Sequence, residues 1–378
     1  MFFYETVFVM TSFCQPTLFL LDVCSQKNSN IVSKLDTSSP EECCAACAAN
    51  SACDLFTYAP HEKRRCHLKA GELIPGDYGN CTTGVRLPPA PPGPTLNVAL
   101  LIVDDLRTDL EHTTDQKVLT PHLLNFASSP STVTLDRSYV QQGVCSPSRN
   151  SFLTGRRPDT TRVWNFERSF RDLPDGPSWV TLPAAFKHAG YLTSGMGKVF
   201  HPNRPANDDV PFSWSPQWEY FQPAVDKCNA SYPIRGDSWC VLDAPDDHFT
   251  DGKIASMAVD RLGEFRSLQS RTGRPFFLAL GFHKPHLPNA IPQRYLDMQP
   301  PADQIAITPH PYFSHDAPRA AYYECQPMEN QTYHFNISSG VPEALQRDYR
   351  RAYHAGISFM DAQAGRVLIA LETLGLAS

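Results

Sequence analysis

The order of apolar and polar residues divides the chain into two parts. Residues 24–86 contain one short helical pattern, SSPEECCAACAAN, followed by short alternating segments such as ACDLFTYAP. From Leu96 onward, continuous apolar runs of strand length alternate with segments of helical period. Continuous apolar runs are typical of strands that are buried on both faces of a parallel sheet. The pattern therefore predicts a small unit followed by a larger α/β unit.

Three apolar runs in the larger unit are predicted strands, namely LNVALLIVDD, YLTSGMGKVF and PFFLALGF. Helices are predicted to begin at Thr120, Thr181 and Pro342, because threonine is a favoured helix cap and proline fits the first turn. Residues 251–268 also have helical period. Since ligands bind at the carboxyl ends of the strands in such sheets, the chemistry of this chain is expected there.

The cysteines and the sequons indicate the compartment. Eight of the twelve cysteines lie at or before Cys81, which is typical of a small disulfide-stabilised module followed by a cysteine-poor domain. Disulfides persist in the secretory pathway, so the chain is expected to enter it. Four N-x-S/T sequons agree with that route as candidate glycosylation sites, and their asparagines are Asn80, Asn229, Asn330 and Asn336.

The amino terminus and the charge narrow the classes further. Residues 1–23 are interpreted as a degenerate signal peptide, with a misassigned start codon as the alternative, because a membrane span needs about 20 uninterrupted apolar residues. No later segment is expected to cross a bilayer. The net charge is −6, and the acidic and basic residues are interspersed without long basic runs. A nucleic-acid partner is therefore not expected. The proline-rich residues 87–95 are a predicted extended linker.

The first strand of the larger unit ends in Asp104 and Asp105. Adjacent carboxylates repel each other and are costly to bury, and a hard cation such as Ca²⁺ or Mg²⁺ would relieve both problems. A solvated turn is the plain alternative, and these two residues alone support it at least as well.

A second candidate is Cys145 in GVCSPSRNSFLTGRRP. A helix is predicted from Pro147 to the residue before Gly155, which puts Cys145 at its N-terminus, where backbone N–H groups favour an anion. Arg149 lies on the same helical face and can hold a tetrahedral oxyanion. This arrangement predicts a site for sulfuryl or phosphoryl transfer. A structural or disulfide-bonded cysteine is equally compatible with the spacing.

The motif Cys-x-Pro-Ser-Arg followed by SFLTGRRP resembles the signature of the sulfatase family, and VDDLR, GKVFHP and FHKPHLP fit the same family. The resemblance covers residues 96–378 and implies an alkaline-phosphatase-like α/β sandwich, with a mostly parallel sheet flanked by helices. It implies hydrolysis of sulfate esters on a sulfated glycan, with a 2-O-sulfated uronic acid as the candidate group. The alternatives are phosphoester or phosphonate hydrolysis in the same superfamily, and a non-catalytic secreted protein that binds glycans or proteins.

The resemblance also implies the cofactors. Cys145 would be oxidised to formylglycine by the formylglycine-generating enzyme of the endoplasmic reticulum. Asp104, Asp105 and the oxygen of the modified Cys145 would bind one Ca²⁺, which would polarise the sulfate.

Four further residues receive catalytic roles from the resemblance. Arg149 would stabilise the hydrated aldehyde, and Lys198 would neutralise the sulfate. His201 would assist proton removal, and His286 would bind sulfate and protonate the leaving oxygen. Taken singly, Lys198 and His201 are more often surface residues after a strand, and the HKPH segment could equally be a solvated loop.

Residues 24–86 resemble the PAN/apple family, whose modules bind proteins or glycans; a passive stabilising appendage is the alternative. A helix is predicted to begin after Ser38 or Ser39. The implied disulfides of this unit are Cys43–Cys66, Cys47–Cys53 and Cys24–Cys81, and Cys44 is an additional cysteine. In the larger unit, the sulfatase resemblance implies a loop closed by Cys228–Cys240, while Cys325 has no evident partner.

Sulfatases complete the calcium site from a later strand that ends in Asp-His-Gly or Asp-Asn-Gly, and this sequence ends at LETLGLAS before such a strand. Asp247-His248 lies too early in the chain for that role and is interpreted as helix-capping loop chemistry. Residues 96–378 are therefore expected to be the N-terminal part of a sulfatase domain. The favoured interpretation is a piece of a longer, extracellular or lysosomal enzyme, and the alternative is a truncated product with weak or no activity.

Overall fold

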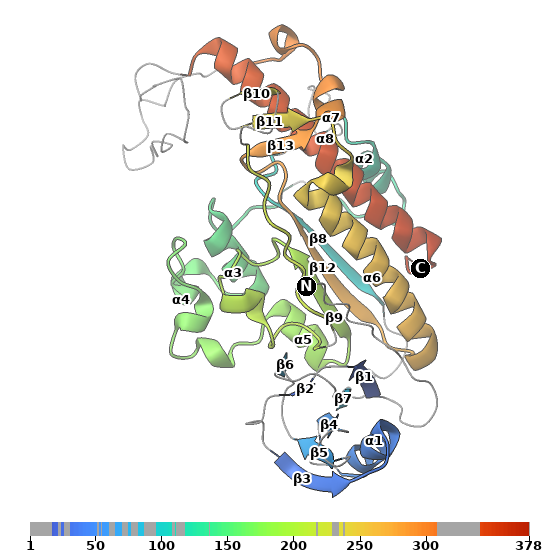
Figure 1. Cartoon of the computed structure of the whole chain (residues 1–378). Helices are drawn as coiled ribbons and strands as arrows, with labels where there is room; N and C mark the ends of the chain where they lie inside the picture. Colours follow the sequence, from blue (N-terminus) through green and yellow to red (C-terminus); the bar gives the residue numbers. More distant parts are fainter. Residues whose placement is uncertain are drawn as a thin grey trace.

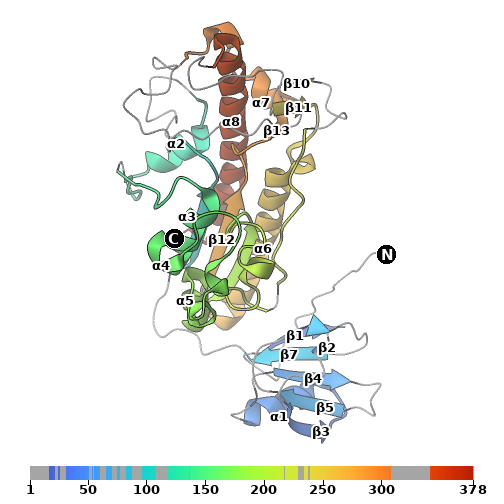
Figure 2. The same cartoon turned by 90° about the vertical axis from the view of Figure 1, so that its left-hand side faces the viewer.

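The structure is a computed structural model that describes residues 17–21, 24–25, 31–50, 53, 55–59, 65–69, 75–76, 82–86, 96–107, 110, 118–135, 137–216, 218–228, 234–236, 239–307 and 341–377. Within these residues the chain forms a small sheet unit up to Arg86. From Val98 onward it forms a larger unit in which a parallel sheet lies between helices (Figures 1 and 2).

The small unit is an antiparallel sheet with one helix, α1 (Pro40–Ala49), packed against it. The helix begins after Ser39, as predicted, because the Ser39 hydroxyl accepts a hydrogen bond from the Glu42 amide at 3.3 Å. The order of the five strands is β1 (Thr17–Leu21), β7 (Thr82–Arg86), β4 (Leu55–Ala59), β5 (Arg65–Lys69) and β3 (Ile31–Asp36). A separate pair is formed by β2 (Cys24–Ser25) and β6 (Pro75–Gly76).

Disulfides fasten the helix of the small unit to its sheet. Cys43–Cys66 and Cys47–Cys53 are both present, as the resemblance implies, and Cys44 is also disulfide-bonded. The bonded cysteines are buried together with aromatic and aliphatic side chains of β4 and β5. Covalent links of this kind compensate for a core that is too small to be stable alone. The implied Cys24–Cys81 bond lies outside the described residues, as do Cys325 and all four sequon asparagines.

The larger unit is organised around three parallel strands in the order β8 (Val98–Val103), β12 (Phe276–Phe282) and β9 (Leu192–Gly197). In the register, Phe282 lies opposite Val103 and Gly281 lies opposite Gly197. The carboxyl ends of the three strands therefore meet at one edge of the sheet, where the candidate residues were expected.

Helices cover both faces of this sheet (Figures 1 and 2). The long helices α6 (Thr250–Thr272) and α8 (Glu343–Thr373) pack against each other, and α3 (Cys145–Thr154), α4 (Pro158–Thr161) and α5 (Leu182–His188) lie on the opposite side. The remaining described elements are α2 (Pro121–Ala127), α7 (Gln293–Asp297), β10 (Ile234–Gly236), β11 (Trp239–Leu242), β13 (Asn289–Pro292) and the 3₁₀ turns Phe170–Asp172, Gly176–Ser178, Ala206–Asp209, Asp246–His248 and Ala302–Gln304. Cys228 and Cys240 form the disulfide that the resemblance implies.

Two predictions about the larger unit need correction. The apolar run of β8 predicts burial on both faces, but all six of its residues are only half-buried. Among the described residues, β12 alone pairs with β8, so one side of this strand has no neighbour. In addition, α3 begins at Cys145 rather than at Pro147, which makes Cys145 the first residue of the helix.

The cap of α2 also differs from the prediction. Thr120 occupies the cap position, but its side chain makes no capping hydrogen bond. The buried Asp361 carboxylate of α8 instead accepts hydrogen bonds from the His122 and Leu123 amides at 3.1 and 2.8 Å. A carboxylate on a helix that is distant in the sequence thus satisfies the first turn of α2.

Within the described residues, no helix is both long and apolar enough to cross a bilayer.

Candidate active site

Two glycines allow the ends of β9 and β12 to approach each other closely. The Lys198 amide donates to the Gly281 carbonyl at 2.8 Å, and a Cβ atom on Gly281 would lie 2.0 Å from the Lys198 carbonyl carbon. Gly197 has a φ of +67°, in the left-handed region that favours glycine. The Gly-Lys sequence at the end of β9 therefore brings Lys198 to the centre of the shared sheet edge.

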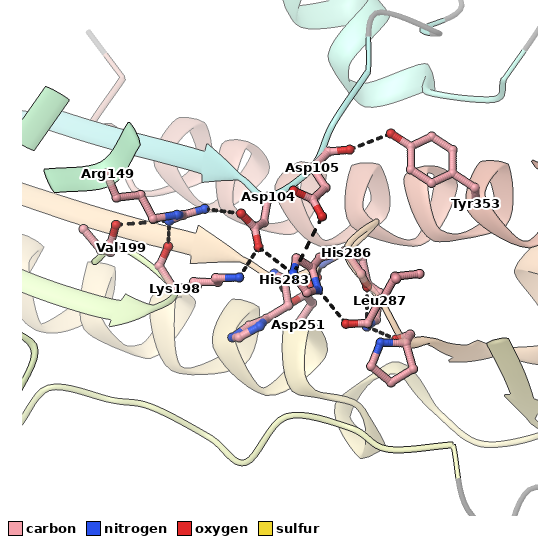
Figure 3. Close-up of polar contacts among 12 residues, drawn as sticks. Asp104, Asp105, Arg149, Lys198, Val199, Asp251, His283, His286, Leu287 and Tyr353 are labelled. Atoms are coloured by element: carbon pink, nitrogen blue, oxygen red, sulfur yellow. Dashed lines mark hydrogen bonds and ion pairs between the residues drawn. The ribbon is translucent and has the colours of Figure 1, made fainter. Parts of the chain in front are cut away.

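Asp104 is the carboxylate on which the charges of the site converge (Figure 3). It is 3% exposed; its Oδ1 accepts from Arg149 Nη2 at 2.9 Å, and its Oδ2 forms an ion pair with Lys198 Nζ. Burial by itself raises the pKa of Asp104, but the neighbouring Arg149 and Lys198 charges outweigh burial and hold this pKa below its usual range. The carboxylate is therefore charged, with two cations beside it.

Arg149 connects the first turns of α3 to the end of β9. Its side chain is buried, and its Nη1 donates to the carbonyl oxygens of Lys198 and Val199, the latter at 3.0 Å (Figure 3). Together with the Asp104 contact, these bonds fix the position of the helix start.

Cys145 lies half-buried at that helix start, and it is a free thiol. This excludes the structural disulfide that the sequence left open. Burial is the main cause that raises the pKa of the Cys145 thiol, and the charges of Lys198, Asp104, Arg149 and Asp105 all act on it. Cys145 therefore belongs to the same site as both aspartates, and as a thiol it stays protonated at neutral pH.

Asp105 and His286 form the exposed side of the site. His286 Nε2 lies 3.7 Å from Asp105 Oδ2 and 3.9 Å from Asp104 Oδ2 (Figure 3). Ligand atoms of Asp104, Asp105 and His286 all lie within 4.8 Å of one another, close enough to share a metal ion. The carboxylates supply the hard oxygen donors that Mg²⁺ and Ca²⁺ prefer, so the residues present fit a divalent cation.

The turn that carries Asp105 is held by a residue of α8 that the sequence did not single out. Tyr353 donates its hydroxyl hydrogen to the Asp105 carbonyl at 2.6 Å (Figure 3). The same hydroxyl accepts from the Arg107 amide at 2.9 Å. Asp105 has a φ of +53°, an uncommon conformation for a non-glycine residue, which these bonds stabilise. Tyr353 lies within the helix predicted to begin at Pro342, and no local signal distinguishes it from the other residues of that helix.

The HKPH segment is not the solvated loop that remained an alternative. His283 and Lys284 are 4% and 1% exposed, and their amides both donate to the buried carboxylate of Asp251 at 2.8 Å. Burial, with the nearby Lys198 and Lys284 charges, lowers the pKa of His283 to about 3, and burial raises the pKa of Asp251 to about 6. Asp251, in the first turn of α6, was also missed because an acidic residue at a helix start is ordinary.

His201 lies beside this cluster and follows β9. Burial first, and then the Lys198 and Arg149 charges, lower the pKa of His201 to about 4, so its ring is neutral at physiological pH. Its Nδ1 is buried and makes no hydrogen bond within the described part of the chain. The ring packs against Phe166 with centroids 4.9 Å apart.

The structure therefore brings together Asp104, Asp105, Cys145, Arg149, Lys198, His201 and His286 around one sheet edge. Asp247 lies apart from them: its carboxylate accepts from Ser256 Oγ at 2.7 Å and from Arg366 Nη1 at 2.8 Å. It makes no capping bond to α6, so the helix-capping interpretation of that dyad is wrong.

A buried cluster of opposite charges lies next to a candidate metal-binding group at the carboxyl ends of parallel strands, which is where α/β proteins bind their ligands. Residues 96–378 match the family model described as Sulfatase, and residues 28–69 match that of the PAN domain. The chain belongs to the sulfatase family.

The chain is also similar to individual proteins with known names. It is 36% identical to the iduronate 2-sulfatases of Mus musculus over 299 residues and of Homo sapiens over 300 residues. Each alignment covers 75% of this chain and 52% of the relative, so the chain spans about half the length of these curated relatives. Among solved structures, the phosphonate monoester hydrolase of Agrobacterium radiobacter matches with a TM-score of 0.50 and 18% identity, over 75% of this chain and 60% of that chain. That likeness concerns the fold alone.

Proposed function

We propose that this chain carries the nucleophile and the anion-binding groups of a sulfuric ester hydrolase that acts on a sulfated glycan, with a 2-O-sulfated uronic acid as the candidate substrate. The observation that carries the proposal is the position of Cys145, first in its helix and in the field of Asp104, Lys198 and Arg149. The 36% identity to iduronate 2-sulfatases supports the substrate class.

Cys145 needs chemical activation for this role. Burial raises the pKa of its thiol, and a protonated thiol is a weak nucleophile. Oxidation of Cys145 to formylglycine by the formylglycine-generating enzyme would supply, as the aldehyde hydrate, one hydroxyl to attack sulfur and a second whose deprotonation releases sulfate.

The residues present would hold one divalent cation, which we propose to be Ca²⁺. Asp104 and Asp105 offer four carboxylate oxygens, and the modified Cys145 would add another. When bound, the cation supplies positive charge that polarises the sulfate ester. In its absence, Arg149 and Lys198 balance the charge of Asp104.

The side chains around the nucleophile have complementary tasks. Lys198 and Arg149 supply positive charge toward the sulfate oxygens and the hydrate, where negative charge increases during transfer. His201 is neutral above about pH 4 and can accept the proton of the second hydroxyl. His286, with 34% of its side chain exposed, can donate a proton to the leaving sugar oxygen.

The proposal extends to the cell. Disulfides in both units and four sequons support a secretory route to the extracellular space or the lysosome, where formylglycine formation precedes delivery. The small unit, which contains the PAN domain, would bind a protein or glycan ligand.

The test is mass spectrometry of the Cys145 peptide from protein secreted by a host that forms formylglycine. The expected peptide carries the aldehyde, and Cys145→Ala is expected to abolish turnover of an aryl sulfate while leaving the circular dichroism spectrum unchanged. Rates on the matching aryl phosphate serve as the comparison for the phosphoester alternative. An unmodified thiol in active protein, or substantial activity in Cys145→Ala, would contradict the proposed role.

A further inference from the structure

Two exposed aromatic side chains stand beside the site and have no part in the chemistry described above. Trp164 is 52% exposed and Phe166 is 48% exposed. Single exposed apolar residues are normal on protein surfaces. Two aromatic rings separated by one residue, at the edge of a polar site, present a larger apolar surface, and such surfaces are typical of ligand-binding sites.

Contacts on both sides attach this aromatic segment to the site. The Gln142 side chain donates to the Trp164 carbonyl at 3.0 Å, and Gln142 precedes Cys145 by three residues. On the other side, the Phe166 ring packs against His201, with centroids 4.9 Å apart. The segment is therefore tied to the loop that precedes the nucleophile and contacts the proposed proton acceptor, and we call it the rim of the site.

A guanidinium completes this rim. Arg204 Nε donates to the Phe166 carbonyl at 3.0 Å, and Arg204 Nη1 donates to the Asn203 carbonyl at 2.8 Å. The Arg204 amide also donates to the His201 carbonyl at 2.7 Å. No carboxylate of the described residues forms an ion pair with Arg204, and carbonyls orient a guanidinium without neutralising it. Its positive charge remains available to a ligand.

We propose that Trp164, Phe166 and Arg204 form a subsite for a uronate ring of the glycan, a refinement that rests on the proposed function. The aromatic rings would pack against the C–H face of the pyranose, and the Arg204 guanidinium would pair with its carboxylate. The charge complementarity selects an acidic sugar over a neutral one, and the contact to His201 aligns the bound ring with the reacting sulfate.

Binding is measured by calorimetry in the Cys145→Ala background of the full chain, so that turnover does not interfere. The probes are a disaccharide with a 2-O-sulfated uronate and the same disaccharide with its carboxyl group reduced. Trp164→Ala is expected to raise the Kd of both probes about tenfold, and Trp164→Phe is expected to retain most of the affinity. Arg204→Gln is expected to raise the Kd of the uronate about tenfold and to leave that of the reduced probe nearly unchanged.

Arg271→Gln is the matched control, because Arg271 lies in the last turn of α6, next to the amino end of β12 and away from the site. Each variant is first checked for an unchanged melting temperature, and the Trp164→Phe and Arg204→Gln variants test the subsite should Trp164→Ala fail to fold. Unchanged affinity in the rim variants, or an equal loss for both probes in Arg204→Gln, overturns the subsite. Failure of the Cys145→Ala protein to bind the uronate disaccharide overturns the subsite as well.

The two proposals fail separately. Wild-type protein that hydrolyses aryl sulfate but binds the disaccharide independently of the rim refutes the subsite only. Wild-type protein that binds the uronate through the rim but carries an unmodified Cys145 and hydrolyses no sulfate refutes the hydrolase only.

Discussion

At the scale of single residues, Asp104 and Asp105 show how two adjacent and identical side chains take different tasks. Asp104 has 4% of its side chain exposed and contacts two cations, whereas Asp105 has 54% exposed. The first is therefore a structural counter-ion as well as a candidate ligand. The Asp105 carboxylate neutralises no buried cation, so its proposed task is metal binding only.

We predict that Asp104→Ala lowers the free energy of unfolding by roughly 3 kcal/mol or more, because it leaves Arg149 and Lys198 buried without their counter-charge. The matched variant Asp105→Ala is expected to change it by less than about 1 kcal/mol. Urea denaturation in a chelator measures both values. Equal losses in the two variants would contradict this division of roles.

A second residue prediction concerns His283 and pH. Its pKa of about 3 in the folded protein lies below the ordinary value of 6.5, so the unfolded chain binds more protons between these values. The stability contribution is complete above pH 6.5 and is lost as the pH falls toward 3. The slope is on the order of 1 kcal/mol per pH unit.

The comparison of wild type with His283→Gln isolates this contribution, because both proteins retain the backbone bonds to Asp251 and the opposite titration of that carboxyl group. The free energy of unfolding between pH 4.5 and 6.5 should fall less steeply with decreasing pH in the variant. Parallel curves would show that His283 does not titrate as stated.

At the scale of elements, α8 acts as a scaffold for both ends of the segment between β8 and α2. Tyr353 holds the Asp105 turn, and Asp361 caps α2. These two residues are eight apart, a little over two helical turns, so they are separated by about 80° around the helix axis and by about 12 Å along it. The position of α8 therefore directly affects the position of the turn that carries the candidate metal ligand Asp105.

Tyr353→Phe tests this effect. Loss of the hydroxyl removes two hydrogen bonds, so the free energy of unfolding should fall by about 1–2 kcal/mol. The apparent Kd for Ca²⁺ should rise several-fold, because the turn is less constrained. Tyr191→Phe is the control, since its ring packs against Phe186 at the opposite edge of the sheet. Unaltered calcium affinity in Tyr353→Phe would show that the Tyr353 hydroxyl does not position the metal ligands.

At the scale of the whole molecule, cation binding and fold stability should be coupled. A ligand that binds only the folded state at 100 times its Kd adds about 2.7 kcal/mol. We expect Ca²⁺ to raise the melting temperature by several degrees in wild type and by clearly less in Asp105→Asn, measured by scanning calorimetry. An identical shift in both proteins would place the cation elsewhere.

Much of this architecture was predictable along the chain. The continuous apolar runs predicted β8, β9 and β12, and the Ser39 and Thr181 caps predicted the starts of two helices. The half-burial of β8 was not predictable. An apolar run indicates that a strand can be buried, but not which elements pack beside it.

By itself, the sequence determined the family, the order of the elements and which candidate residues follow the strand ends. These follow from local spacing and from a specific motif around Cys145. Only the tertiary structure decided which of these groups are buried, which charges meet at Asp104, and that Asp251, Tyr353 and Arg204 support or surround the site. The physical reason is distance along the chain. Lys198 meets Asp104 across 94 residues and Tyr353 meets Asp105 across 248, and no local periodicity encodes such contacts.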